Sequence, residues 1–134
     1  MPKLYSIDVD ETLEISRGPV SIQSLRDLKA SGQIVGLCGN WALFCQRVPD
    51  WHNIVSFVNC GLVQFEYQGQ IIGDKAWFLR NLQTYVRADE YIHVGNCLNE
   101  KNSLGFICGS DDKGAAEKAG WRFIKEDDFA KGVR

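Results

Sequence analysis

Short apolar runs recur along the chain, separated by segments with a different pattern. Residues 4–7 form such a run, which is too short and too rich in β-forming residues for a helix. A continuous apolar run of this length is typical of a strand buried on both faces, as in a parallel sheet. Similar runs predict further strands over residues 33–38, 53–60, 90–96 and 121–124.

The intervening segments carry apolar residues at helical spacing. Ser21 is a suitable N-cap for one helix, and Gly32 is a suitable end for it. Between them, Ile22, Leu25 and Leu28 fall on one face of that helix. The same pattern predicts helices over residues 40–48, which Pro49 stops, 74–86 and 111–120.

The alternation of strands with helices predicts an α/β fold, a Rossmann-like three-layer sandwich with a mainly parallel sheet. Residues 61–72 follow a different pattern, because polar and apolar residues alternate around Gln68-Gly69, which predicts a small β-hairpin. The chain has 134 residues, of which 45% are hydrophobic, and this is enough for one core. We therefore expect one domain spanning residues 1–134.

Composition narrows the classes of partner. The formal net charge is -2 and no basic block stands out, so nucleic acid is not an expected partner. A membrane is not expected either, because no apolar run approaches the roughly 20 residues of a membrane span. The N-terminal residues lack a signal peptide's apolar stretch. The five cysteines are odd in number, and no pair has C-x-x-C spacing, which favours reduced thiols in a cytoplasmic protein over disulfides or a zinc site.

Acidic residues cluster directly after the first strand, in the segment DVDET. Asp8, Cys38 and Asn96 each end a predicted strand, and the carboxyl ends of parallel strands meet at the edge where such sheets bind ligands. Asp8 and Asp10 would repel each other there, and a hard divalent cation such as Mg²⁺ relieves that repulsion. A carboxylate can also attack phosphorus while a second one transfers the proton. The alternative is an acidic turn on the surface.

Several segments of the chain resemble the haloacid dehalogenase-like (HAD-like) superfamily of phosphohydrolases. Residues 6–14, SIDVDETLE, are similar to its first motif, D-x-D-x-T after an apolar strand. The resemblance implies that Asp8 is the nucleophile and Asp10 the general acid/base. It also implies that Mg²⁺ binds the Asp8 carboxylate and the Asp10 carbonyl oxygen. Residues 73–82, GDKAWFLRNL, are similar to the third motif, so that Lys75 is expected to pair with the nucleophile and the phosphoryl group.

Residues 32–41, GQIVGLCGNW, resemble the second motif of the same superfamily. The family has Thr or Ser where this chain has Cys38, and a thiol is a weaker donor to a phosphoryl oxygen than a hydroxyl. The resemblance implies that the substrate phosphate is held by Thr12, Cys38, Gly39, Asn40 and Lys75.

The fourth motif shows the largest departure. Asn96 ends its strand where the family has Asp, so the affinity for Mg²⁺ should fall. Residues 110–124, SDDKGAAEKAGWRFI, are similar to the rest of the motif and favour Asp111 or Asp112 as the second metal acid. Another register would use Glu100, and the two aspartates can also serve simply to cap a helix. The metal ligands that the resemblance implies are Asp8, Asp10, Asn96 and Asp111 or Asp112.

The segments between Thr12 and Cys38 and between Cys38 and Lys75 are too short for the cap domain that many HAD-like phosphatases carry. The resemblance therefore implies a small capless member, whose substrate is a phosphorylated small molecule or an accessible phosphate on a macromolecule. The predicted hairpin is apolar, and it either forms a contact in a homo-oligomer or packs on the core of its own chain. Its apolar residues are Phe65, Tyr67, Ile71 and Ile72.

These expectations lead to one function and one alternative. The first is a Mg²⁺-dependent phosphomonoesterase that works through an aspartyl-phosphate on Asp8. The alternative is a catalytically weakened HAD-like domain that binds a phosphorylated ligand or a protein partner. A phosphatase for nucleic-acid ends is disfavoured by the net charge of -2. His93 lies inside a predicted strand, where a structural, hydrogen-bonded histidine is expected rather than a catalytic base.

Overall fold

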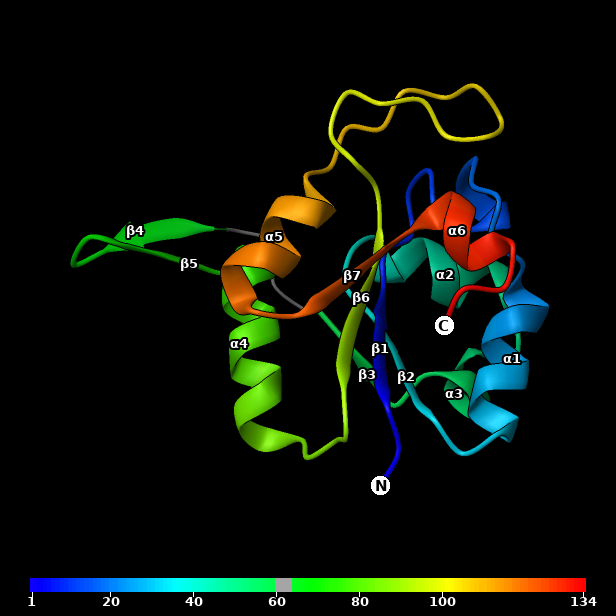
Figure 1. Ribbon diagram of the computed structural model, residues 1–134, viewed down its shortest axis with the longest axis horizontal. Coiled ribbons are helices and arrows are strands. Elements are labelled where there is room, and N and C mark those ends of the chain that lie inside the picture. The colour runs from blue at the N-terminus through cyan, green and yellow to red at the C-terminus, as the bar shows by residue number, and fades with distance from the viewer. Residues whose placement is uncertain (60–63) are drawn as a thin grey trace.

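The computed structural model describes residues 1–59 and 64–134. Its centre is a five-stranded parallel sheet with the strand order β3-β2-β1-β6-β7. The central strand β1 (Leu4–Ile7) pairs with β2 (Ile34–Leu37) on one side and β6 (Tyr91–Gly95) on the other. The edge strands are β3 (Phe57–Val58) and β7 (Arg122–Lys125). The predicted α/β fold is confirmed (Figure 1).

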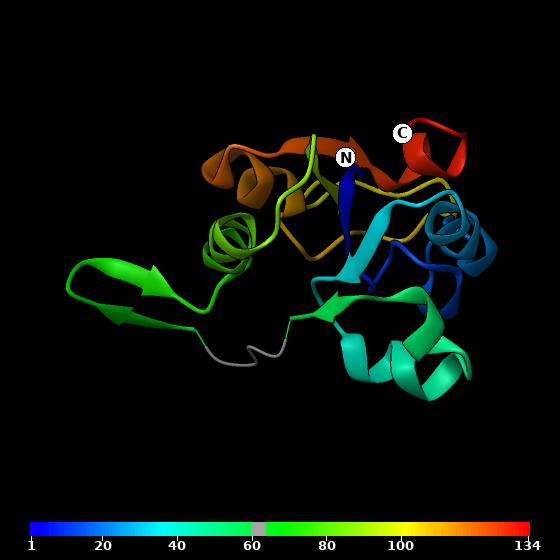
Figure 2. The same ribbon diagram turned by 90° about the horizontal axis from the view of Figure 1, so that it is seen from below.

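Helices cover both faces of the sheet, which gives three layers, as Figure 2 shows from a second direction. On one face, α4 (Lys75–Tyr85) and α5 (Asp112–Ala119) lie side by side. A short 3₁₀ turn, Glu14–Ser16, lies in the loop after β1. The helices of the other face are α1 (Ile22–Ala30), α2 (Trp41–Arg47), α3 (Trp51–Ile54) and α6 (Glu126–Ala130).

The alternation of side chains along β1 divides the core into two halves. Tyr5 and Ile7 are fully buried on the face of α1 and α6, whereas Leu4 packs with the apolar side chains of α4 and α5 on the opposite face. Successive side chains of a strand point to opposite faces, so one four-residue strand serves both halves. This alternation also determines on which side of the sheet the next residue, Asp8, presents its carboxylate.

Side chains cap the starts of three helices, and the caps at Ser21 and Asp111 are at predicted positions. Ser21 Oγ accepts a hydrogen bond from the backbone N–H of Ser24 at the start of α1. The carboxylates of Asp74 and Asp111 accept from backbone N–H groups in the first turns of α4 and α5. Such caps satisfy N–H groups that have no partner inside the helix.

One strand prediction is largely wrong, and two short helices, α3 and α6, were not predicted. Residues 51–54 form α3, and only Phe57 and Val58 of the predicted strand 53–60 pair with β2; residue 60 lies outside the described part. The apolar pattern alone does not separate a helical turn from a short edge strand, because both need only a few buried residues. The five residues of α6 are too short for a helical period to be visible in the sequence.

The predicted hairpin is present over the described part of residues 61–72, of which residues 61–63 lie outside the description. β4 (Phe65–Tyr67) pairs antiparallel with β5 (Gln70–Ile72), and both turn residues have positive φ angles. Figures 1 and 2 show the hairpin projecting away from the sheet and helices. Phe65, Tyr67 and Ile71 are 55%, 58% and 50% exposed, so these side chains do not pack on the core of their own chain.

No helix within residues 1–59 and 64–134 combines the length and the apolar character that crossing a membrane requires.

The buried face of α1 provides a test of the core. Leu25 is fully buried, so Leu25→Ala should lower the free energy of unfolding by about 2–5 kcal/mol in urea denaturation followed by circular dichroism. Tyr85→Ala is the control, because Tyr85 is 82% exposed at the end of α4 and its loss should change stability by no more than about 0.5 kcal/mol. Equal losses in the two variants would contradict this division of core and surface.

Glu126 is an unusual buried acid at the start of α6. Its side chain is fully buried, and among the described residues neither carboxylate oxygen has a hydrogen-bond partner. Burial raises the pKa of Glu126 to about 7. Between the ordinary pKa of 4.5 and this value, the folded protein holds a proton that the unfolded chain releases. The free energy of unfolding therefore falls as pH rises through this window.

Glu126→Gln removes this titration. Relative to wild type, the variant should gain stability between pH 5 and pH 8, by at most about 1.4 kcal/mol for each pH unit, because a complete difference of one bound proton sets that limit. Urea denaturation over this pH range measures the slope, and Asp128→Asn, in an exposed residue of the same helix, is the matched control. Parallel stability curves for wild type and Glu126→Gln would show that the buried carboxyl does not titrate in this window.

Candidate active site

The carboxyl ends of β1, β2 and β6 lie at the same level of the sheet. Ile7 is in register with Leu37 of β2 and Val94 of β6. The backbone N–H of Asp8 continues the ladder by donating to the carbonyl of Val94 over 2.9 Å, and that of Cys38 donates to Ile7 over the same distance. This register brings together Asp8, Cys38 and Asn96, the three strand-ending residues that the sequence predicts at this edge.

The Asp8 carboxylate is 2% exposed and has partners on both oxygens. Oδ1 accepts a hydrogen bond from Lys75 Nζ at 2.8 Å. Oδ2 accepts from Asn96 Nδ2 at 3.0 Å and, at 3.2 Å, shares the single Thr12 hydroxyl proton with Asn96 Oδ1. Gly39 leaves room for this arrangement, since a Cβ at that position would lie 2.6 Å from Asp8 Oδ1. The carboxylate is therefore held in one orientation.

Lys75 links two buried carboxylates. Its Nζ lies 2.8 Å from Asp8 Oδ1 and 2.8 Å from Asp112 Oδ1, and these two side chains come from different elements at the same edge. The residue opens α4, directly after the capping Asp74, so the helix start determines where the side chain begins. Burial lowers the pKa of Lys75, but the two carboxylates outweigh it and raise the pKa above its ordinary value. Lys75 is thus a permanent ammonium.

One ammonium between two carboxylates leaves one negative charge uncompensated. Burial raises the pKa of Asp8 to about 8 against the opposing effect of Lys75, and the nearby Asp112 raises it further. Burial also disfavours ionisation of Asp112, but Lys75 and His93 together hold the pKa of Asp112 below its usual range. The proton or cation that completes the charge balance is therefore taken up on the Asp8 side.

Asp112 is held by its protein partners on all sides. His93 Nε2 is hydrogen-bonded to the ionised Oδ1 at 2.8 Å, and the other ring nitrogen of His93 is hydrogen-bonded to the Ser6 hydroxyl at 3.2 Å. The backbone N–H of Asn96 donates to Asp112 Oδ2 at 2.9 Å. A Cβ at position 95 would lie 2.4 Å from Asp112 Cγ, so Gly95 makes this approach possible. His93 is a buried structural histidine, and its role is to orient Asp112.

The three candidates for a second metal acid occupy different places. Asp112 contacts Lys75 and Asn96, whereas the Asp111 carboxylate caps α5 through Gly114 N–H. Glu100 lies in the loop after β6, where its Oε1 is 3.4 Å from Lys125 Nζ. Of the three, the structure brings Asp112 into contact with the Asp8–Lys75 pair.

The Asn96 side chain completes the contacts around Asp8. Its Nδ2 donates to Asp8 Oδ2 at 3.0 Å and to the backbone carbonyl oxygen of Asp10 at 2.8 Å. Its Oδ1 accepts from the Thr12 hydroxyl at 3.0 Å. Asp8 Oδ2 and the Asp10 carbonyl oxygen, both of which could bind a cation, thus lie within hydrogen-bonding distance of one atom, Asn96 Nδ2.

This donor set fits Mg²⁺. The ion accepts one or two carboxylates with carbonyl oxygens and keeps several waters. Here the possible ligands are Asp8 Oδ2, the Asp10 carbonyl oxygen and the Asn96 amide oxygen. Rotation of the Asn96 amide would bring its oxygen to the position that its nitrogen now occupies. Within residues 1–59 and 64–134, no group of three or more His, Cys, Asp or Glu side chains is arranged to hold a metal ion. A cation here would therefore depend on backbone and amide oxygens.

Asp10 lies at the outer side of Asp8. Its Oδ1 accepts a 2.7 Å hydrogen bond from the Ser16 hydroxyl and a longer one, 3.4 Å, from Asn40 Nδ2. Its side chain is only partly buried, so it remains accessible to a ligand at the sheet edge. Ser16 lies in the 3₁₀ turn that follows the acidic segment, and nothing in the sequence pattern had marked it.

Cys38 is fully buried and its thiol is neutral. Burial raises the pKa of Cys38 to about 12, and Asn59 Nδ2 lies 3.8 Å from the sulfur. A thiol of this kind is not a nucleophile near neutral pH. Cys38 follows the end of β2, next to the end of β1, and it can offer only a weak S–H donor. Cys38, Cys45, Cys97 and Cys108 are free thiols.

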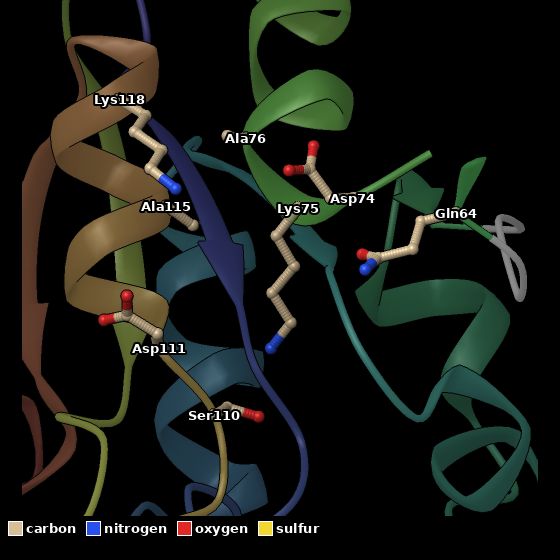
Figure 3. Close-up of a pocket in the computed structure, with 8 residues that line it drawn as sticks. All are labelled: Gln64, Asp74, Lys75, Ala76, Ser110, Asp111, Ala115 and Lys118. Carbon is tan, nitrogen blue, oxygen red and sulfur yellow. The ribbon is translucent and has the colours of Figure 1, made fainter. Parts of the chain in front are cut away.

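A cavity of about 220 Å³ opens beside Lys75. Figure 3 shows that the Lys75 side chain extends from the first turn of α4 away from the capping carboxylate of Asp74. Lys118 of α5 reaches toward the same space, and Gln64 approaches from the base of the hairpin. The cavity is thus lined by charged and polar side chains together with apolar surface, and Lys75, which contacts Asp8, is one of the lining residues.

The loop after β6, residues 97–109, is attached to the loop after β1. Asn102 Nδ2 donates to the carbonyl oxygens of Glu11 and Arg17, at 3.1 Å and 2.8 Å. This loop thus supports the backbone around the acidic segment.

No family model, curated protein or solved structure matches this chain.

Lys75→Met tests the charge balance of the site. Removing the ammonium leaves the buried, ionised Asp112 carboxylate without its counter-charge, so the free energy of unfolding at pH 7 should fall by about 3–5 kcal/mol in urea denaturation. The ionised Asp112 has a lowered pKa, so its stabilising effect is present above the ordinary pKa of 3.8 and disappears below it. The difference between wild type and variant should therefore persist down to about pH 4 and narrow only as pH falls further.

Lys113→Met is the control for this prediction, because Lys113 is an exposed lysine in the first turn of α5. It should change stability by no more than about 0.5 kcal/mol. A Lys75→Met protein as stable as wild type at pH 7 would mean that Lys75 does not neutralise these carboxylates.

Proposed function

We propose that this protein is a Mg²⁺-dependent phosphohydrolase of the HAD-like type, a phosphomonoesterase that forms an aspartyl-phosphate on Asp8. The observation that carries the proposal is the contact of Lys75 Nζ with Asp8 Oδ1 and Asp112 Oδ1, both at 2.8 Å. A carboxylate at the end of the central strand is thereby buried beside a fixed ammonium. That is the arrangement expected where a nucleophile meets a group that carries several negative charges.

The nucleophilic step requires an oriented and ionised Asp8. Thr12 and Asn96 hold Oδ2, and Lys75 holds Oδ1, so the carboxylate cannot rotate freely. An ionised Asp8 oxygen attacks phosphorus, the ester bond breaks, and the phosphoryl group is transferred to Asp8. When bound, Mg²⁺ supplies positive charge that favours the ionised carboxylate and offsets charge on the phosphoryl oxygens.

Proton transfer falls to Asp10 in this proposal. As the ester bond breaks, Asp10 gives a proton to the leaving oxygen, and it then takes one from the water that hydrolyses the aspartyl-phosphate. Ser16 and Asn40 contact Oδ1 of Asp10, which orients the side chain at the accessible edge of the site.

The substrate of this proposal is a phosphorylated small molecule or an exposed phosphate on a macromolecule. The cavity of about 220 Å³ beside Lys75 would receive the part of the substrate next to the phosphate. Between β3 and α4, the described residues 64–73 add only the projecting hairpin, which leaves room for a larger substrate. The exposed apolar residues of the hairpin are candidates for a contact between two copies of the chain.

The second candidate function is a HAD-like domain with weakened catalysis that binds a phosphorylated ligand or a protein partner. The specific observation in its favour is the uncharged Asn96, whose amide nitrogen donates to the oxygens that would bind the cation. The neutral, buried Cys38 thiol also supports it, since it is a poor donor to phosphate.

Phosphate release decides between the two functions. Purified protein is tested with p-nitrophenyl phosphate and a panel of sugar phosphates, with Mg²⁺, Mn²⁺ or Co²⁺. Asp8→Asn should reduce kcat by at least about a thousandfold, because the nucleophile is lost. Asp27→Asn, an exposed aspartate on α1, should keep wild-type activity.

Binding of inorganic phosphate, measured by calorimetry, separates the alternative. Phosphate binding without turnover of any substrate in the panel, and unaffected by Asp10→Ala, would favour the binding module. Turnover that persists in Asp8→Asn would remove Asp8 as the nucleophile.

A further inference from the structure

The side-chain amide of Asn96 occupies the point where the potential cation ligands converge. Its nitrogen is 3.0 Å from Asp8 Oδ2 and 2.8 Å from the Asp10 carbonyl oxygen. Asn96 is fully buried, between the ends of β6 and β1. Figure 1 shows these two strands side by side at the centre of the sheet. The amide is therefore not accessible to solvent.

The orientation of this amide follows from the chemistry of its neighbours. The carbonyl oxygen of Asp10 can only accept hydrogen bonds, so the group that faces it must be the NH₂. On the other side, the Thr12 hydroxyl donates to Asn96 Oδ1 at 3.0 Å. The opposite orientation would place the amide oxygen against both a carboxylate and a carbonyl, which is unfavourable without a cation between them.

We propose that the Asn96 amide is a built-in substitute for the metal ion: in the metal-free protein its NH₂ group bridges Asp8 and Asp10, and a divalent cation binds only when the amide rotates and presents its oxygen. The inference takes the cation site of the proposed function as its starting point. It adds that this chain holds its nucleophile in place without metal, and that cation affinity is low because binding must displace two internal hydrogen bonds.

An aspartate at this position would behave in the opposite way. Its carboxylate has no N–H to donate, so in the absence of metal it would face Asp8 Oδ2 and the Asp10 carbonyl with like charge and dipole. With a cation, the same carboxylate would add a charged ligand, and ligand charge is a main determinant of affinity for such ions. Compared with an aspartate, Asn96 thus lowers the affinity for the cation and stabilises the site in the absence of metal.

Asn96→Asp tests the proposal with readouts that need no turnover. In EDTA, the midpoint of thermal unfolding should fall by about 5 °C or more relative to wild type. Mg²⁺ should restore it, and calorimetry should show Mg²⁺ binding at least about tenfold tighter than in wild type. Asn53→Asp, in an exposed residue of α3, matches the change in net charge and should leave both measurements at their wild-type values.

A measurement on the wild-type protein covers the case in which Asn96→Asp does not fold. The Asn96 NH₂ protons, observed by NMR in EDTA, should exchange with solvent at least about tenfold more slowly than those of the exposed Asn53, because both are hydrogen-bonded and buried. Rapid exchange of the Asn96 amide would overturn the proposal. So would an Asn96→Asp protein with unchanged Mg²⁺ affinity or with unchanged stability in EDTA.

These outcomes are independent of the proposed activity. If no phosphate ester is hydrolysed but Asn96→Asp gains Mg²⁺ affinity and loses stability in EDTA, the phosphatase proposal fails and the role of Asn96 stands. If hydrolysis depends on Asp8 while Asn96→Asp behaves like wild type in both Mg²⁺ binding and stability, the phosphatase proposal stands and the role proposed for Asn96 fails.

Discussion

The ammonium of Lys75 is the interaction on which the arrangement of this sheet edge depends. Two carboxylates from separate parts of the chain, Asp8 and Asp112, are buried within reach of each other and share this one cation. Their mutual repulsion would otherwise oppose folding. The position of Lys75 at the first turn of α4 therefore couples the packing of that helix to the orientation of Asp8.

Around this charge cluster, the side chains of Asn96, His93 and Thr12 add further hydrogen bonds. Asp112 is fully satisfied by Lys75, His93 and the backbone of Asn96, so it acts as the support of the site rather than as a free acid. Burial raises the pKa of Asp8, and the nearby Asp112 carboxylate raises it further. At Asp112, Lys75 and His93 together outweigh burial and lower the pKa.

The sequence could predict the parallel sheet, the capped helices and the meeting of Asp8, Cys38 and Asn96, because each depends on local periodicity and on the rule that parallel strands end at one edge. It left Asp111 and Asp112 as equal candidates, since adjacent residues at a helix start point in different directions that only the packing of α5 decides. The orienting role of His93 was not visible either. The residue looks like any buried strand histidine until its ring meets Asp112.

The projecting hairpin has a consequence for how this fold can change over evolutionary time. Its exposed strands contribute little to the core, so its length can change without disturbing the layers beneath it. It leaves the body next to α4, the helix whose first residue contacts Asp8. Insertions in the hairpin would therefore enlarge the chain on the side of α4, while the charged cluster around Asp8 stays the same.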